Sequence, residues 1–196
     1  LHLSIRRQRQ MCIRDSYRLS IDPQRILITP GGSGALLLAA SLLVDPGKHW
    51  LLADPGYPCN RHFLRLVEGA AQLVPVGPEQ RYQLTPESVA EYWNGDSVGA
   101  LLASPANPTG TLLSAAELAA LSAALKARGG HMVVDEIYHG LTYGVDARSV
   151  LEVDNDAFVL NSFSKYFGMT GWRLGWLVAP DCLLYTSPSP RDVEES

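Results

Sequence analysis

Seven short runs of hydrophobic residues recur along the chain, and each ends in polar or turn-forming residues. The runs are continuous rather than alternating, which is typical of strands that are buried on both faces of a sheet. Proline cannot donate a hydrogen bond to a neighbouring strand, so Pro75 predicts that its run lies at a sheet edge or is irregular. The runs span residues 25–29, 50–53, 71–76, 98–103, 131–134, 157–160 and 174–178.

Three segments between these runs have helical patterns. Residues 114–128 open with an S-x-x-E capping box, are rich in Ala and Leu, and stop at a Gly-Gly pair. Residues 85–93 begin with a Thr-Pro cap, and residues 34–43 are apolar nearly all round, which predicts a buried helix. Strands that alternate with helices predict an α/β fold with a mainly parallel central sheet flanked by helices. Ligands of such sheets bind beyond the carboxyl ends of the strands.

Length and charge narrow the classes of protein. The chain has 196 residues, of which 46% are hydrophobic, so it can bury the core of one domain or of one lobe of a larger protein. Its formal net charge of −4 argues against a nucleic-acid partner or an anionic membrane surface. No apolar run approaches the roughly 18 residues that a membrane span needs. The cysteines have no metal-ligand spacing, so we expect no metal site.

The two ends of the chain differ from its middle. The basic stretch RRQRQMCIRDS has the composition of a targeting peptide, but part of CLLYTSPSPRD can be encoded by the reverse complement of codons for MCIRDS. Such an inverted pair resembles translated library adaptor, so we expect residues 1–16 and 182–196 not to be native and to lie outside the core. Residues 17–181 then contain one cysteine, Cys59, which cannot form an intrachain disulfide and is compatible with a cytoplasmic location.

Polar and glycine-rich motifs follow most of the predicted strands. PGGSGA leads from the first run into a helix, where free N–H groups and an accessible backbone favour an anion, although an ordinary tight turn has the same residues. DPGYPCN places Tyr57 after the second run, and SPANPTG holds Asn107 between two prolines after the fourth. An aromatic that only packs and a turn-forming asparagine are the plain alternatives.

Two further motifs contain ionisable groups. Asp135 in VVDEIYHGL ends a buried strand, where a carboxylate is costly unless it is paired or functional, and a helix N-cap is the alternative. Tyr138, three positions later, would share one side of a helical turn with it. Lys165 lies in the apolar motif SFSKYFGMTGWRLGW, and a desolvated lysine readily loses its proton and forms Schiff bases. Arg173 offers a fork suited to phosphate, and a surface ion pair between these two side chains is the alternative.

Together these groups would suit pyridoxal phosphate. The cofactor needs an amine, a carboxylate beside its pyridine nitrogen, donors at its phenolic oxygen, an aromatic ring over its face and an anion site for its phosphate. The motifs GGSGAL, DPGYP, SPANPTG, VVDEIYHGL and SFSKYFGMTGWRLGW, in this order, resemble the class I and II aminotransferases of fold type I, the aspartate-aminotransferase-like superfamily. The resemblance covers residues 17–181 and implies an incomplete large domain that binds pyridoxal 5'-phosphate.

The resemblance also implies a role for each candidate residue. Lys165 resembles the Schiff-base lysine that moves the substrate proton, Asp135 the partner of the pyridine nitrogen, and Tyr57 the stacking aromatic. Asn107 and Tyr138 resemble the groups that bond the phenolic oxygen, and Tyr138 joins Lys165 and Asp135 as a catalytic residue. The implied phosphate ligands are Ser33, Gly34, Ala35, Ser162, Ser164 and Arg173.

The implied function is transfer of an amino group between an amino acid and a 2-oxo acid by a full-length homodimer, with the fragment inactive alone. In this family an N-terminal arm and a small C-terminal domain complete the site, and the arginine for the substrate carboxylate lies in that small domain. We expect both to lie outside residues 17–181, so the sequence does not identify the substrates. A lyase or synthase on the same fold, and the aminotransferase-like domain of a transcription regulator, are the alternatives. A bare α/β domain without activity fits the ordered motifs poorly.

Overall fold

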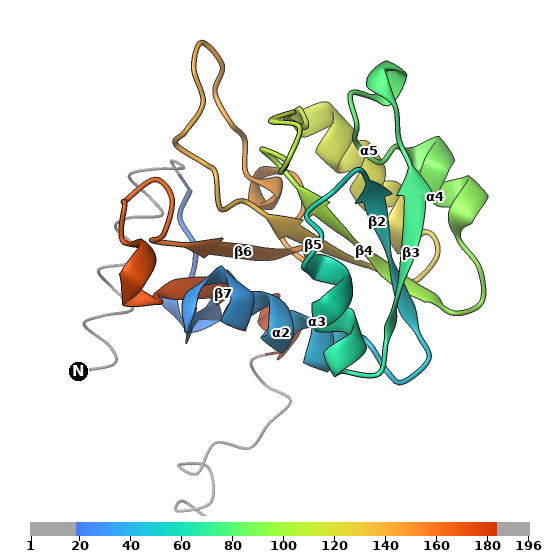
Figure 1. Cartoon of the computed structure of the whole chain (residues 1–196), viewed down its shortest axis with the longest axis horizontal. Coiled ribbons are helices and arrows are strands. Elements are labelled where there is room, and N and C mark those ends of the chain that lie inside the picture. The colour runs from blue at the N-terminus through green and yellow to red at the C-terminus, as the bar shows by residue number, and fades with distance from the viewer. Residues whose placement is uncertain (1–18, 184–196) are drawn as a thin grey trace, which may run out of the picture.

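The computed structural model describes residues 19–183, which form a seven-stranded sheet with helices on both faces (Figure 1). The strands lie in the order β1-β7-β6-β5-β4-β2-β3. All neighbouring strands are parallel except for the two antiparallel pairs that β7 makes with β1 and β6. The mainly parallel α/β sheet predicted from the sequence is therefore confirmed. The strands are β1 (Ile26–Thr29), β2 (His49–Asp54), β3 (Ala70–Pro75), β4 (Ser97–Ala103), β5 (His131–Asp135), β6 (Phe158–Ser162) and β7 (Gly175–Val178).

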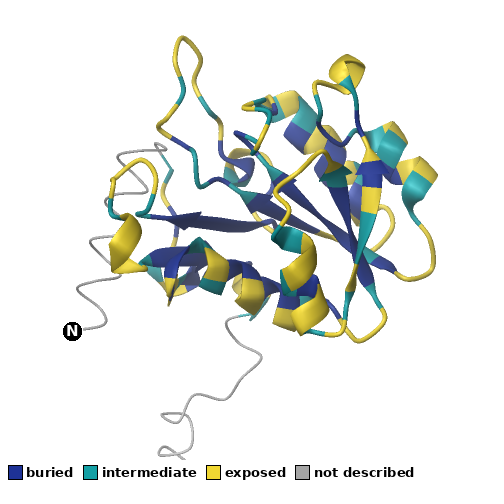
Figure 2. Cartoon of the chain, in the orientation of Figure 1, coloured by how far each residue is buried: buried dark blue, intermediate teal, exposed yellow. Residues whose placement is uncertain are grey.

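Successive residues of the central strands enter two different hydrophobic layers. Leu51 packs with the helices α4 (Pro86–Tyr92) and α5 (Ala115–Lys126), whereas Leu52 packs with α2 (Gly31–Leu43) and α3 (Asn60–Leu66). Side chains alternate across a sheet, so a sheet covered on both faces needs hydrophobic residues at every position. Figure 2 shows the central strands dark blue between helices whose outer surfaces are yellow. The continuous hydrophobic runs thus follow from the three-layer arrangement.

The predicted edge strand and helix caps are confirmed. Pro75 is the last residue of β3, the strand at one end of the sheet, where a missing N–H disrupts no central ladder. Ser114 accepts a hydrogen bond from the Glu117 N–H at 3.3 Å, and the Glu117 carboxylate accepts one from the Ser114 N–H at 2.8 Å. Thr85 caps α4 in the same way through its hydroxyl oxygen. Each cap satisfies N–H groups that the helix itself cannot bond.

Two helices differ from the prediction. Helix α2 starts at Gly31 rather than at residue 34, and it is not buried all round, because Leu37, Leu38 and Leu42 are exposed. Its buried positions recur with helical spacing and face the sheet, while the apolar residues between them face outward. Helix α3 was not predicted. It is short, its N-cap position is Cys59, and no side chain caps it, so it lacks the signals that marked α4 and α5.

The expectations for the chain ends are tested only in part. Residues 1–16 and 184–196 lie outside the described residues. Leu183, in a 3-10 turn formed by Asp181–Leu183, packs partly buried against the layer under α2 and α3 but outside the sheet. No helix within residues 19–183 is long and apolar enough to cross a membrane.

Candidate functional site

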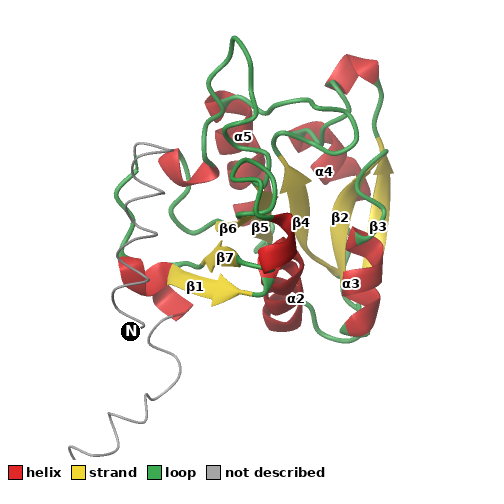
Figure 3. Ribbon diagram, turned by 60° about the vertical axis from the view of Figure 1, so that its left-hand side comes forward, coloured by secondary structure: helices red, strands yellow, loops and turns green. Residues whose placement is uncertain are grey.

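A cavity of about 200 Å³ opens at the carboxyl ends of β4, β5 and β6, where the loops gather beyond the strand arrowheads (Figure 3). Parallel strands end at the same edge of a sheet, so residues that are distant in the chain meet there. The predicted residues that line this cavity are Ser33, Tyr57, Asn107, Asp135, Tyr138, Ser164, Lys165 and Arg173. The structure therefore brings together most of the candidates, from six different segments of the chain.

The loop after β4 holds Asn107 by internal hydrogen bonds. The Ala106 N–H donates to the Thr111 carbonyl at 2.9 Å, and the Gly110 N–H donates to the Ala106 carbonyl at 2.8 Å. The buried Gln83 side chain donates to the carbonyls of Ala103 and Thr111 at 3.0 and 3.2 Å. These hydrogen bonds hold the two ends of the loop together. Asn107 is therefore both a turn residue and a residue that lines the cavity.

Asp135 lies at the last position of β5, opposite Ala103 of β4. One carboxylate oxygen accepts a hydrogen bond from the Ile137 N–H at 2.9 Å, so the side chain caps a turn. The alternative of a helix N-cap does not hold, because no helix follows Asp135. Burial of the carboxyl raises its pKa to about 6, while the Ile137 N–H and the positive charge of Lys165 act in the opposite direction. A carboxyl in this state gains most from a further positive charge placed beside it.

Lys165 follows β6 and points into the same cavity. Its Nζ lies 5.4 Å from the centre of the Tyr138 ring, a cation–π distance. The residue is exposed, so the desolvated amine expected from the apolar motif is not found within the described residues. The other two lysines are engaged elsewhere: Lys48 donates to Asp96 at 2.9 Å, and Lys126 donates to Asp154 at 2.6 Å.

The anion end of the cavity is formed by the start of α2 and by Arg173. The N-cap residue Pro30 makes no side-chain cap, so the first N–H groups of the helix, those of Gly31–Ser33, have no intrahelical acceptor. Gly31 has φ +76°, and a Cβ there would lie 2.7 Å from Nη2 of Arg173. The guanidinium also donates to the Thr170 carbonyl at 3.2 Å. A helix N-terminus and a guanidinium this close together favour a dianion.

Three of the implied phosphate ligands lie elsewhere. Gly34 and Ala35 do not line the cavity, and Ala35 is fully buried in the core, because α2 begins earlier than predicted. Ser162 is also buried, but its Oγ lies 2.5 Å from the Ser164 Oγ, which lines the cavity. Ser162 thus supports the cavity wall from behind through Ser164. The backbone N–H groups without an intrahelical acceptor are those of Gly31–Ser33, at the start of α2.

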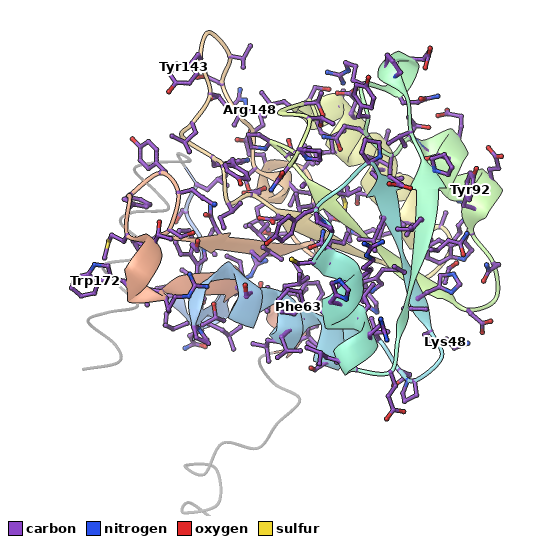
Figure 4. All side chains as sticks on the ribbon, viewed as in Figure 1. Lys48, Phe63, Tyr92, Tyr143, Arg148 and Trp172 are labelled. Carbon is purple, nitrogen blue, oxygen red and sulfur yellow. The ribbon has the colours of Figure 1, made fainter. Side chains whose placement is uncertain are left out.

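Tyr57 lies at the mouth of the cavity and is 43% exposed. A hydrogen bond with Cys59 and then burial raise the pKa of its phenol, with smaller contributions from Cys59, Tyr138 and Asp135. The lining residues that sequence reasoning missed include Asn60, Phe63 and Thr170. The first two belong to α3, where Phe63 is labelled in Figure 4, and the unpredicted helix carries them.

Comparisons with known proteins identify the family of the chain. The model of the family "Aminotransferase class I and II" matches residues 2–191. The chain is 42% identical over 167 residues to the valine–pyruvate aminotransferase of Mycobacterium tuberculosis, which covers 84% of this chain and 43% of that protein. It is 31% identical over 172 residues to the aspartate aminotransferase of Thermotoga maritima, covering 86% of this chain and 46% of the relative.

Solved structures give the same result. The fold matches a crystal structure of an aminotransferase from Mycobacterium tuberculosis with a TM-score of 0.85 and 38% identity, over 91% of this chain and 49% of that one. It matches the aspartate aminotransferase from Thermus thermophilus with maleate with a TM-score of 0.84 and 28% identity, over 91% of this chain and 47% of that one. The chain spans about half the length of the curated relatives it matches. It belongs to the class I and II aminotransferase family, whose members depend on pyridoxal phosphate.

Proposed function

We propose that the full-length protein to which this chain belongs is an aminotransferase that uses pyridoxal 5'-phosphate to move an amino group between an amino acid and a 2-oxo acid. The observation that carries the proposal is the convergence of Lys165, Asp135 and Arg173 on one cavity at the carboxyl ends of the strands. An amine, a carboxyl and an anion-binding end in a single cavity are the three kinds of group that the cofactor requires.

The residues present fit this cofactor. The space beside Gly31 is one that a Cβ would fill, since it would lie 2.7 Å from the Arg173 guanidinium, and this leaves the backbone open to a phosphate. We assign the phosphate to the amides of Gly31–Ser33, to Ser164 with Ser162 behind it, and to Arg173. Asp135 would hold the pyridine nitrogen, and Tyr57 would cover the ring. The groups proposed for the phenolic oxygen are Asn107 and Tyr138.

The cofactor, when bound, supplies an electron sink for the carbanion formed at the substrate α-carbon. The Nζ of Lys165 would link covalently to it and, once displaced by the substrate amine, would take the proton from the α-carbon. Tyr138 lies beside Lys165 and would keep the amine oriented toward the cavity. Asp135 must be ionised to pair with a protonated pyridine nitrogen. Its pKa of about 6 leaves the carboxylate the main form at neutral pH, and a neighbouring cation would lower that pKa further.

Substrates and assembly belong to the same proposal. The similarity to a protein named valine–pyruvate aminotransferase makes small aliphatic amino acids and pyruvate the first pair to assay. We propose a cytoplasmic homodimer, supported by exposed aromatic side chains near the site, such as Trp172 and Tyr143 in Figure 4, and by the free thiol of Cys59. We also propose residues 17–181 as the native part of the chain, inactive without the rest of the protein.

The test uses the full-length protein reconstituted with pyridoxal phosphate. Borohydride reduction followed by peptide mass analysis should place the cofactor on Lys165, and Lys165→Ala should abolish both the trapping and the visible absorption. Lys48→Ala and Lys126→Ala are matched controls that should keep both, because these amines are held in ion pairs. Amino transfer without release of ammonia separates a transaminase from a lyase. Trapping at another lysine in the Lys165→Ala protein would overturn the assignment.

A further inference from the structure

Two buried titratable side chains lie directly behind the candidate site. Glu136 follows Asp135 in the chain and is 1% exposed, and His139 follows Tyr138 and is 3% exposed. Oε2 of Glu136 lies 3.6 Å from Nδ1 of His139. Neither residue lines the cavity, and the proposed reaction uses neither of them. A carboxyl and an imidazole buried together call for a reason, because burying each group is costly.

Glu136 joins three segments of the chain. Its Oε1 accepts a hydrogen bond from the Val150 N–H at 2.8 Å, at the end of the long loop that leaves the site. Its backbone N–H donates to the Leu160 carbonyl of β6 at 2.9 Å. The carboxyl thus holds the turn that contains Asp135 and Tyr138 against the returning chain at Val150, while the Glu136 backbone holds the same turn against the strand that leads to Lys165. Replacing it with a small apolar side chain would leave a buried N–H without its acceptor.

His139 extends the same connections to the loop after β4. Its backbone N–H donates to the Glu136 carbonyl at 2.9 Å. The Ser104 backbone raises the pKa of its imidazole, so the ring lies beside Ser104, and the Ser104 N–H donates to the Asp135 carbonyl at 3.0 Å. Ser104 opens the loop that holds Asn107. Glu136 and His139, here called the Glu136–His139 pair, therefore contact both segments that hold the groups proposed for the phenolic oxygen.

Charge does not explain the pair, because both groups are neutral near pH 7. Burial raises the pKa of Glu136 to about 8, against the Val150 N–H and the Ser149 hydroxyl, with Asp135 and Glu152 adding repulsion. Burial lowers the pKa of His139 to about 4, and the Ser104 backbone opposes that shift. A neutral carboxyl and a neutral imidazole avoid the desolvation cost of an ion pair, and Glu136 keeps its hydrogen bond from the Val150 N–H. Such a neutral pair can instead fix the orientation of the segments that it contacts.

We propose that the Glu136–His139 pair is a positioning pair that fixes Asn107 and Tyr138 relative to each other. The cofactor part rests on the proposed function: misplacing these two groups changes the proton affinity of the Lys165 nitrogen when the cofactor is bound. The position of the two loops themselves does not depend on the cofactor. The two consequences can therefore be measured separately.

The first measurement is amide hydrogen exchange in the full-length protein without cofactor. Glu136→Ala should accelerate exchange in the segments around Asn107, Tyr138 and Val150, whereas Glu136→Gln should not, because the amide oxygen can still accept the hydrogen bond from the Val150 N–H. Asp154→Asn is the matched control, since Asp154 is an equally buried carboxylate bonded to Ser122 and far from the site. It should lower the melting temperature without changing exchange at the segments around Asn107 and Tyr138; the segment around Val150 is left out of this comparison because the Asp154 N–H donates to the Val150 carbonyl.

The second measurement is the pH titration of the visible absorption after reconstitution with pyridoxal phosphate. Glu136→Ala should move the titration midpoint by about 0.5 pH unit or more and weaken cofactor binding by about tenfold, because its proposed hydrogen bonds are misplaced. Glu136→Gln should restore the wild-type midpoint, and Asp154→Asn should not move it. If Glu136→Ala does not fold, His139→Ala takes its place, with the same expectations at the segments of Asn107 and Tyr138.

The outcomes distinguish this proposal from the proposed function. Wild-type exchange at the segments around Asn107 and Tyr138 in both alanine variants would overturn the positioning pair. So would a lower melting temperature with an unchanged midpoint, which is the mark of a role in stability alone. A wild-type protein that traps no cofactor would overturn the proposed function, and the exchange comparison would still decide whether the pair holds the two loops.

Discussion

Gly31→Ala is the sharpest test of the anion end of the site. Gly31 starts α2 with φ +76°, a conformation that costs an L side chain about 1 kcal/mol. The added Cβ would also lie 2.7 Å from Nη2 and 3.1 Å from Cζ of Arg173. The guanidinium ends a flexible side chain and can shift, so the clash should appear as a displaced arginine rather than as a large loss of folding free energy.

Gly47→Ala is the matched control. Gly47 has φ +81°, but a Cβ there meets nothing within 4 Å. Both substitutions should therefore lower the free energy of unfolding by about 1 kcal/mol in chemical denaturation. Only Gly31→Ala should weaken binding of pyridoxal phosphate, by about tenfold or more, because a charge-assisted hydrogen bond contributes about 1.5–3 kcal/mol.

The assay is a fluorescence titration of the full-length apoprotein with pyridoxal phosphate and, separately, with pyridoxal, which lacks the phosphate. Gly31→Ala should lose affinity for the first ligand and keep its affinity for the second. Equal losses for both ligands would mean that the substitution disturbs the whole cavity. An unchanged affinity for pyridoxal phosphate would refute the placement of the phosphate between α2 and Arg173.

Two further predictions concern stability. Ser114→Ala should lower the free energy of unfolding by about 1 kcal/mol, because it removes the cap of α5, while Ser41→Ala, which loses only a bond to the Leu37 carbonyl within α2, should be nearly neutral in the same denaturation experiment. Burial would raise the pKa of Asp154, but hydrogen bonds from Lys126 and Ser122 outweigh it and hold that pKa below 3.8. The stability that the Asp154 carboxylate contributes is therefore present above pH 3.8 and is lost as the pH falls through the folded pKa. Asp154→Asn should make the melting temperature depend less steeply on pH between about pH 2 and pH 5. A melting temperature that falls with pH as steeply as in the wild type would contradict this prediction.

The sequence predicts those features that depend on local chemistry. The hydrophobic runs locate every strand, since a doubly covered sheet leaves no polar position in its centre. The Ser114 cap and the edge position of Pro75 are also local, because each depends on which backbone groups a few neighbouring residues can bond. Asp135 ends one predicted strand and Lys165 follows another. Because the alternating pattern predicted parallel strands, both residues could be placed at the same edge of the sheet, and β5 and β6 are indeed parallel.

The features that the sequence does not predict depend on distant neighbours. Helix α3 has no capping side chain and takes its order from the surrounding structure, so Asn60 and Phe63 could not be assigned to the site. The exposure of Lys165 depends on which segments cover the cavity. The apolar motif around Lys165 does not determine which other segments lie over it. The contact between Glu136 and His139 requires the turn after β5, where the sequence favoured a helix.

Gly175 shows how the one antiparallel strand assembles the anion end. It starts β7, where it pairs with Thr29 at the end of β1 and with Ser162 at the end of β6. A Cβ at this position would lie 2.6 Å from the Gly31 carbonyl carbon and 2.8 Å from the Asn161 carbonyl oxygen, both backbone atoms that cannot move aside. Any side chain would therefore separate the start of α2 from the end of β6. Because β7 runs against both neighbours, the residues just before it, including Arg173, reach the edge where those two strands end, and the absence of a side chain at Gly175 lets the three segments meet.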